Sequence, residues 1–253
     1  MKDFSINLSI NQVMSILSKA LDYIDARLID HGRRVAYIVY KMMQTDGSYQ
    51  EKDMQEICIT VALHDIGAYK TEEINHMMRF ESVDVFDHSI YGYLFFKYMS
   101  PLRRWAEVIL YHHVNYEIYP QLDYSHLDVA DMIHLADRMD VFLRMKKRWQ
   151  NIDEVCKQQD IQFGKTTVEL FLKANERWNI EENIINGSYL EELDALVSAA
   201  EYSEETLMEF VSMIAYSIDF RSEVTVSHVA ATASISTELG KLFGLDENEL
   251  KKL

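Results

Sequence analysis

The sequence predicts an all-α protein, and three observations support that fold class. Its 253 residues include only 8 Gly and 2 Pro, roughly 3% and 1%, whereas average usage is about 7% and 5%. β-Hairpins and Gly-rich phosphate loops both need such residues, and neither G-x-G-x-x-G nor a Walker A loop occurs in the sequence. Apolar residues recur instead at the three- and four-residue spacing of helices that bury one face.

The first three helices follow from this spacing and from the residues between them. One is expected over residues 9–28, and a second begins after Asp30, a suitable N-cap, and ends at the turn over 45–48. The third runs from about 53 to 66 through a nearly continuous apolar stretch, so it should be buried. Gly67 is in position to end that third helix.

The middle of the chain is expected to hold three more helices. Two of them, over 87–99 and 101–113, are divided by Pro101, which suits the first turn of a helix. A tyrosine-rich loop over 114–125 follows. A long helix over 126–148 comes after that loop.

The C-terminal part reads as shorter helices to about residue 200, separated at Gly164 and Gly187, and then as long helices that start near Ser203 and Val224. Residues 217–253 are similar to residues 24–57, because each segment has Asp-x-Arg upstream of a histidine, then an apolar helix, a turn and an acidic helix start. Two amphipathic helical hairpins look alike in any case, so the pattern alone leaves true repetition open.

The charge of the chain restricts its binding partners, and its cysteines indicate the cellular compartment. The 25 basic and 41 acidic residues give a net charge of −16, which would repel polymeric nucleic acid. No apolar stretch reaches the roughly 18–20 residues that a membrane helix needs, and residues 1–11 do not resemble a signal peptide. Cys58 and Cys156 lack any C-x-x-C spacing, as suits a reducing compartment. We therefore expect a cytoplasmic protein without membrane or nucleic-acid partners.

Polar residues interrupt apolar helix ends at several places, and these are the candidate functional residues. Burial of such groups without partners is costly. Taken singly, each histidine is best interpreted as a core or surface residue. The set as a whole predicts a metal site, and its members are His31, His64, Asp65, His88, His112, His113 and Asp137.

The donor set and its spacing indicate the kind of metal site. Imidazole nitrogens mixed with carboxylate oxygens suit borderline metals such as iron, manganese, nickel or zinc. Adjacent residues on a helix diverge by about 100°, so the His112-His113 pair suits two neighbouring ions better than one. A carboxylate directly after a histidine, as in His64-Asp65, can bridge two ions about 3.5–4 Å apart.

This arrangement resembles the HD-domain metal-dependent phosphohydrolase superfamily, and within it the HD-GYP branch, which hydrolyses cyclic di-GMP. The likeness covers roughly residues 20–145 and implies a helical bundle. The matching segments are His31-Gly32-Arg33-Arg34-Val35-Ala36, Ala62-Leu63-His64-Asp65-Ile66-Gly67, His88-Ser89-Ile90-Tyr91-Gly92, Ile109-Leu110-Tyr111-His112-His113 and Ala136-Asp137-Arg138-Met139-Asp140.

The resemblance implies a role for each matching residue. His31, His64, Asp65 and Asp137 match the basic metal ligands, whereas His88, His112 and His113 match the histidines of a second site, with Asp65 as the bridge. It implies two divalent ions, most simply Fe or Mn, with Ni, Zn or Mg as alternatives. A water held between the ions would attack phosphorus. The residues expected to support ligands or meet the substrate are Asp140, Arg34, Arg144 and Tyr119.

The departures from the family bear on the substrate. The branch has a phosphate-contacting lysine where this sequence has Ala68, and Lys70 is the candidate catalytic substitute. The G-Y-P loop after the paired histidines keeps only Tyr119-Pro120 and is two residues shorter. The glutamate that binds a third metal in some members is replaced by Arg27, so two metals are expected rather than three.

The expected organisation is an HD-GYP-like domain over 1–150, a helical connector over 151–202, and helices over 203–253 that resemble the start of a second, incomplete domain. In that last part His228 is a poor ligand candidate. The predicted function is metal-dependent hydrolysis of a small phosphoester or phosphodiester, such as a nucleotide or cyclic dinucleotide. The alternative is a catalytically weak HD module that binds metal or nucleotide as a sensor or interaction domain.

Overall fold

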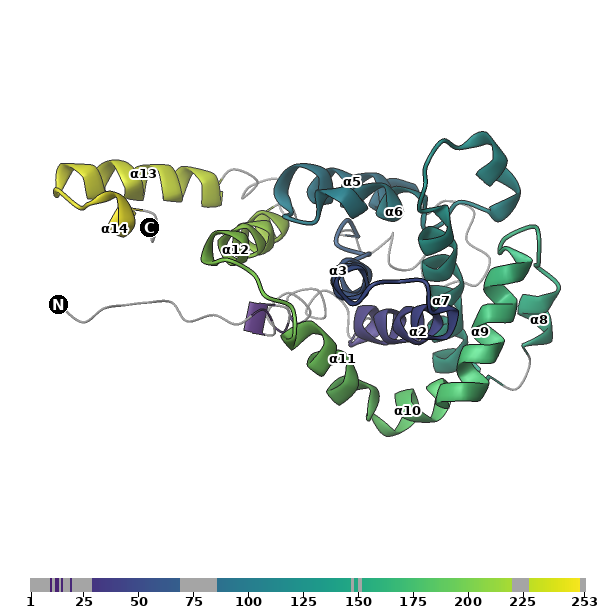
Figure 1. Ribbon diagram of the computed structural model, residues 1–253. Helices are drawn as coiled ribbons and strands as arrows, with labels where there is room; N and C mark the ends of the chain where they lie inside the picture. The colour runs from purple at the N-terminus through teal and green to yellow at the C-terminus, as the bar shows by residue number, and fades with distance from the viewer. Residues whose placement is uncertain are drawn as a thin grey trace.

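The computed structural model of the protein describes residues 29–68, 86–146, 148–149, 152–219 and 228–250, together with a few positions between 10 and 19. Within these ranges every regular element is a helix, and the one β-bridge is isolated. This confirms the all-α prediction (Figure 1). No helix in the described part of the chain is long and apolar enough to cross a membrane.

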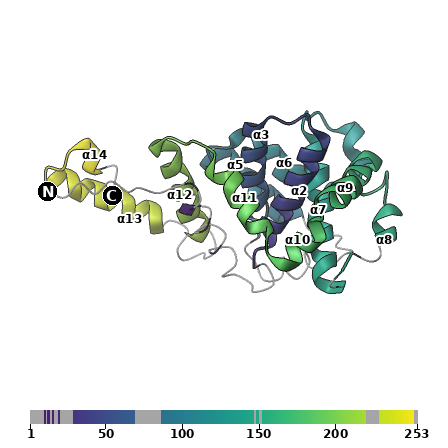
Figure 2. The same cartoon turned by 60° about the horizontal axis from the view of Figure 1, so that its bottom comes forward.

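Helix α2 (His31–Asp46) lies at the centre of the bundle, in contact with α3 (Glu51–Ala62), α7 (Leu127–Lys146) and α9 (Lys165–Trp178), as Figures 1 and 2 show. The apolar face of α2, including Val35, Ile38 and Met42, is fully buried. Burial of each such side chain contributes about 1.5–3 kcal/mol. The helix ends where Gly47 takes a left-handed φ of 79°, at the predicted turn.

Several expected helix ends differ from the structure. Asp30 precedes α2 but has a left-handed φ of 56° and makes no side-chain capping hydrogen bond. Helix α3 ends at Ala62, four residues before the expected position, because His64 Nδ1–H donates to Val61 O at 2.8 Å and the chain continues in tight turns. Gly67 therefore lies in these turns, beyond the end of the helix.

Pro101 separates α5 (Phe86–Met99) from the next helical segment, as predicted. That segment is made of η2 (Arg103–Trp105) and α6 (Ala106–Tyr111). The expected tyrosine loop contains a 3-10 helix, η3 (Tyr116–Gln121), because Tyr116 N–H and Glu117 N–H donate to carbonyls of residues 162 and 161. Helix α6 contacts α7, and this contact brings the paired histidines that follow α6 close to α7.

The shorter helices after α7 are α8 (Asp153–Cys156), α9, α10 (Ile180–Asn186) and α11 (Tyr189–Ser198). Three of them, α9, α10 and α11, pack onto α2, partly through Lys41, which is buried and pairs with Glu192 of α11. The Lys41 ammonium also lies 4.5 Å from the Trp178 ring centroid. These helices therefore share the core of the bundle, and the domain boundary expected at 150 stays a prediction.

The last helices are α12 (Glu204–Asp219), α13 (His228–Leu242) and α14 (Glu247–Leu250). Helix α12 packs against α5, whereas α13 and α14 lie away from the bundle in both views (Figures 1 and 2). His228 is exposed at the start of α13. The interpretation of residues 203–253 as the start of a second, incomplete domain stays a prediction.

Asp131 joins α7 to the start of α9 and predicts a pH dependence of stability. Its Oδ2 accepts a hydrogen bond from Gly164 N–H at 2.9 Å, but Oδ1 is buried without a hydrogen-bond partner. Burial raises its pKa from 3.8 to about 6, although hydrogen bonds from Thr167 and Gly164 oppose that rise. The folded protein therefore binds this proton more tightly than the unfolded chain.

Stability should consequently fall as Asp131 ionises, and Asp131→Asn should remove that effect. Between about pH 4 and pH 6 the wild-type free energy of unfolding is expected to decrease relative to the variant by roughly 1–3 kcal/mol. Urea unfolding at pH 4 to 8 measures the difference. The exposed Asp123 supplies the control variant, Asp123→Asn. A difference that does not change with pH would refute this prediction.

Candidate metal centre

The seven predicted ligands come from five segments that meet inside the bundle. His31 opens α2, His64 and Asp65 follow α3, and His88 lies in the first turn of α5. The paired histidines follow α6, and Asp137 lies in the middle of α7. All seven side chains are buried, with exposed fractions of 0–8% for the residues His31, His64, Asp65, His88, His112, His113 and Asp137.

The first group comprises His31, His64 and Asp65, each of which offers one donor atom within 4.8 Å of the others. Asp65 Oδ2 lies 3.5 Å from His31 Nε2 and 3.3 Å from His64 Nε2. Because His64 uses Nδ1–H for the carbonyl of Val61, its Nε2 atom carries the lone pair and faces the group.

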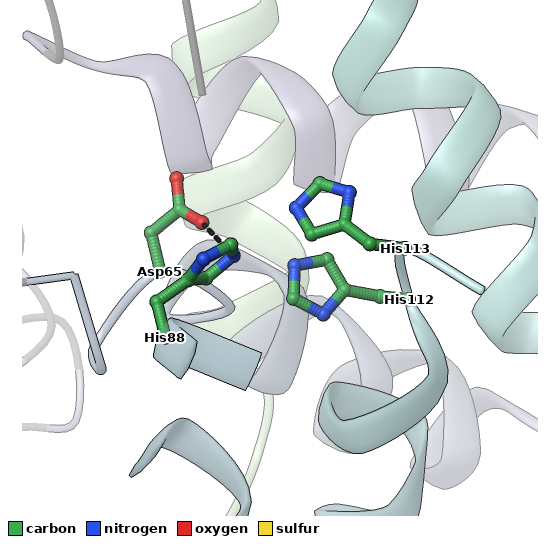
Figure 3. A group of neighbouring side chains, drawn as sticks. All are labelled: Asp65, His88, His112 and His113. Carbon is green, nitrogen blue, oxygen red and sulfur yellow. Dashed lines mark ion pairs between the residues drawn. The ribbon is translucent and has the colours of Figure 1, made fainter. Parts of the chain in front are cut away.

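The second group comprises Asp65, His88, His112 and His113, whose donor atoms also lie within 4.8 Å of one another. Figure 3 shows Asp65 and His88 facing the two adjacent imidazoles across a narrow gap. Asp65 Oδ1 lies 3.6 Å from His88 Nε2. His112 Nδ1–H donates to the carbonyl of Ile109 at 2.6 Å, so its Nε2 is a free acceptor.

Asp65 belongs to both groups, and its two oxygens divide between them. Oδ2 faces His31 and His64, whereas Oδ1 faces His88. A carboxylate shared in this way is the usual bridge between two cations about 3.5–4 Å apart. The structure thus brings together six of the predicted ligands in the arrangement expected of a two-metal site.

Several donor atoms in these groups have no hydrogen-bond partner although they are buried. Such atoms cost free energy unless another group satisfies them. The atoms are His64 Nε2, Asp65 Oδ1 and Oδ2, His88 Nε2, His112 Nε2 and His113 Nε2.

Asp137 lies beside both groups rather than inside either of them. Its Oδ1 is 3.1 Å from His31 Nε2, and its Oδ2 is 4.0 Å from His113 Nδ1. The neighbouring Arg138 donates to Oδ2 through Nη2 at 2.5 Å and through Nε at 3.1 Å. Asp137 can therefore turn only Oδ1 toward the first group without losing the arginine.

A hydrogen-bonded chain supports His31 from behind. Asp140 Oδ2 accepts the Nδ1–H of His31 at 2.7 Å, and Arg34 holds the same carboxylate through Nε at 2.5 Å and Nη2 at 3.0 Å. Carboxylates in this position orient a metal-bound imidazole and raise its basicity. This geometry fits the supporting role expected of Asp140 and Arg34.

Burial and neighbouring charges set the protonation of the cluster. Burial opposes protonation of His31, but Asp137 and Asp140 outweigh it and raise its pKa from 6.5 to about 10. Burial and adjacent imidazoles hold the pKa of His112 and of His113 well below 6.5. These two imidazoles are therefore neutral donors, and a cation at His31 Nε2 would displace a proton.

The other predicted residues are Lys70, Arg144 and Tyr119. Lys70 lies outside the described residues. Arg144 is half-buried two turns beyond Asp137 on α7. Tyr119 is buried with its ring 5.4 Å from that of Tyr116, and its contact with a substrate stays a prediction.

Sequence reasoning did not single out Arg138 as part of this site. It is 4% exposed and contacts a predicted ligand directly. The pattern that identified the ligands also identifies Arg138, because it is a charged residue within the mostly apolar segment 129–143. Such a residue needs a buried partner, and the preceding aspartate is the nearest one.

Comparison with known proteins identifies the family and one relative of this chain. The HD domain family model matches residues 28–201, a range that includes all seven predicted ligands. The 3'3'-cGAMP-specific phosphodiesterase 1 of Vibrio cholerae serotype O1 is 23% identical over 265 residues, covering 98% of this chain and 61% of that protein. The chain thus spans less than two thirds of that relative's length. No solved structure matches the chain. The chain belongs to the HD domain family of metal-dependent phosphohydrolases.

Proposed function

We propose that this protein is a two-metal phosphodiesterase that hydrolyses a small cyclic dinucleotide. The observation that carries the metal part of the proposal is the set of buried, unpartnered donor atoms that converge on Asp65. One ion is assigned to His31, His64 and Asp65, with Asp137 beside them. The other is assigned to Asp65 and the three histidines of the second group.

The ions, when bound, would lower the pKa of a water and offset the negative charge that develops on the phosphoryl oxygens. The residues of this chain hold that centre in place. Asp65 keeps the two groups together through its separate oxygens, and Asp140 fixes the ring orientation of His31. The reaction adds water to phosphorus and breaks one P–O bond of the diester, which leaves a phosphomonoester and a free hydroxyl.

Two observations support a small phosphodiester as the substrate. The Vibrio cholerae relative is specific for 3'3'-cGAMP by name and aligns over 98% of this chain. The net charge of −16 disfavours a polyanion, whereas bound cations would attract a small anion to the centre itself. We infer that a cyclic dinucleotide is the substrate class, and 3'3'-cGAMP and cyclic di-GMP are the first compounds to test.

Metal content is expected to be two divalent ions per chain, with iron or manganese as the preferred pair. Protein purified without chelator should contain them by elemental analysis, and dialysis against EDTA should remove both ions together with the hydrolytic activity. Addition of Mn²⁺ should restore activity, because the ligands are preformed. Protein that contains no transition metal and takes up none would contradict the proposal.

One observation favours the weaker alternative, a metal-binding module that senses nucleotides. The family's phosphate-contacting lysine is replaced by Ala68, whose side chain carries no charge and is only 1% exposed. Position 68 therefore cannot pair with a phosphate. A panel of mononucleotides and cyclic dinucleotides, monitored for phosphate release and diester cleavage, separates the two functions. Two bound ions with no turnover on any compound would favour the module over the enzyme.

A further inference from the structure

Arg138 is a buried cation that directly contacts a ligand of the centre. Its Nη2 and Nε both donate to Asp137 Oδ2, at 2.5 and 3.1 Å. Consecutive residues on a helix point about 100° apart, so these bonds join two side chains that leave α7 in different directions. Two bonds from one rigid guanidinium to one oxygen restrict the rotation of the Asp137 carboxylate.

This contact gives the two oxygens of Asp137 different environments. Oδ1 lies 3.1 Å from His31 Nε2, on the side of the first group. Oδ2 is occupied by Arg138 and is 4.0 Å from His113 Nδ1. Without the arginine, rotation of the carboxylate could present both oxygens to one ion, or could turn Oδ1 away from His31.

We propose that Arg138 is a positioning residue that keeps Asp137 Oδ1 facing the first group, so that Asp137 binds a cation through that single oxygen. This inference rests on the proposed function, because it requires that the cluster hold divalent ions. Arginine suits the task better than lysine, since lysine is a point charge and cannot hold an oxygen through two fixed donors.

The competing interpretation is that Arg138 only neutralises a buried carboxylate. That role predicts lower stability of the metal-free protein when the arginine is replaced, but unchanged metal affinity in the molecules that remain folded. A positioning role predicts a loss of affinity that affects one ion and acts through Asp137. Metal affinity therefore distinguishes the two roles, and stability alone does not.

The experiment titrates the metal-free protein with Mn²⁺ by calorimetry, comparing wild type with Arg138→Met. Loss of residues that orient metal ligands typically costs 10–100-fold in affinity, so one Mn²⁺ should bind at least 10-fold more weakly while the other changes less than threefold. Arg148→Met is the matched control, because Arg148 pairs with Glu182 at the surface. Its two affinities should equal those of wild type.

A double-mutant cycle with Asp137→Asn completes the test. If Arg138 acts through Asp137, Arg138→Met should cause no further loss in the Asp137→Asn background. Unchanged affinities in Arg138→Met, or an equal loss in both backgrounds, would overturn the positioning role.

A second variant, Arg138→Lys, serves if Arg138→Met fails to fold. It keeps the charge and should weaken binding of the same ion three- to 10-fold, and wild-type affinity in this variant would overturn the role. Wild type that binds no Mn²⁺ would instead refute the proposed function itself.

Discussion

Asp65→Asn is expected to abolish hydrolysis and to remove at least one bound ion while leaving the metal-free protein folded. Asp65 is the one residue shared by both ligand groups, and the amide cannot supply two anionic oxygens. The loss in kcat/KM should be on the order of 10³-fold, equivalent to about 4 kcal/mol of transition-state stabilisation. The bound metal should fall from two ions per chain to one or none, measured by elemental analysis.

Stability separates this effect from misfolding. Asp65 is buried and neither of its oxygens has a hydrogen-bond partner, and His31 keeps its closer partners Asp137 and Asp140, so removal of the Asp65 charge should change the melting temperature of the metal-free protein little. Excess Mn²⁺ should raise the melting temperature of wild type, because a ligand that binds only the folded state stabilises it. That rise should be smaller in Asp65→Asn and persist in full in the surface control Asp123→Asn. A variant that keeps two ions would show that Asp65 is not the bridge.

The helices were predictable from sequence because their apolar spacing is local, whereas their ends depend on distant contacts. The buried face of α2 and the turn at Gly47 lie where the spacing places them. The end of α3 does not, because the chain leaves the helix at Leu63 for tight turns that place Asp65 against the distant residues His31 and His88. Likewise η3 forms through hydrogen bonds to residues 161 and 162, which its own sequence does not indicate.

The ligand set was predictable for a different reason. A polar residue within an apolar stretch requires a buried partner, so the motifs around His64 and His112 identify candidates without any structure. The pattern does not tell which oxygen of Asp65 faces which group, or that Arg138 occupies one oxygen of Asp137. Those features depend on side-chain rotation in the packed bundle.

Gly67→Ala is expected to destabilise the protein strongly and to weaken metal binding. A Cβ atom at this position would lie 2.0 Å from the carbonyl oxygen of His88 and 2.6 Å from the backbone nitrogen of Gly92. Both obstacles are backbone atoms of α5, so a rotamer change cannot relieve the clash. The turns that carry Asp65 would have to move away from α5, at a cost of about 3 kcal/mol in the free energy of unfolding.

The same movement would separate Asp65 from His88, whose facing atoms are 3.6 Å apart, and so open the second ligand group. Urea unfolding and Mn²⁺ titration measure the two effects. Gly47→Ala is the control, since Gly47 has a left-handed φ of 79° and a Cβ atom added there would meet nothing within 4 Å. It should cost about 1 kcal/mol through backbone strain alone and leave metal affinity unchanged. If Gly67→Ala matched that control in both measurements, the close approach of the turns to α5 would not be what holds Asp65 and His88 together.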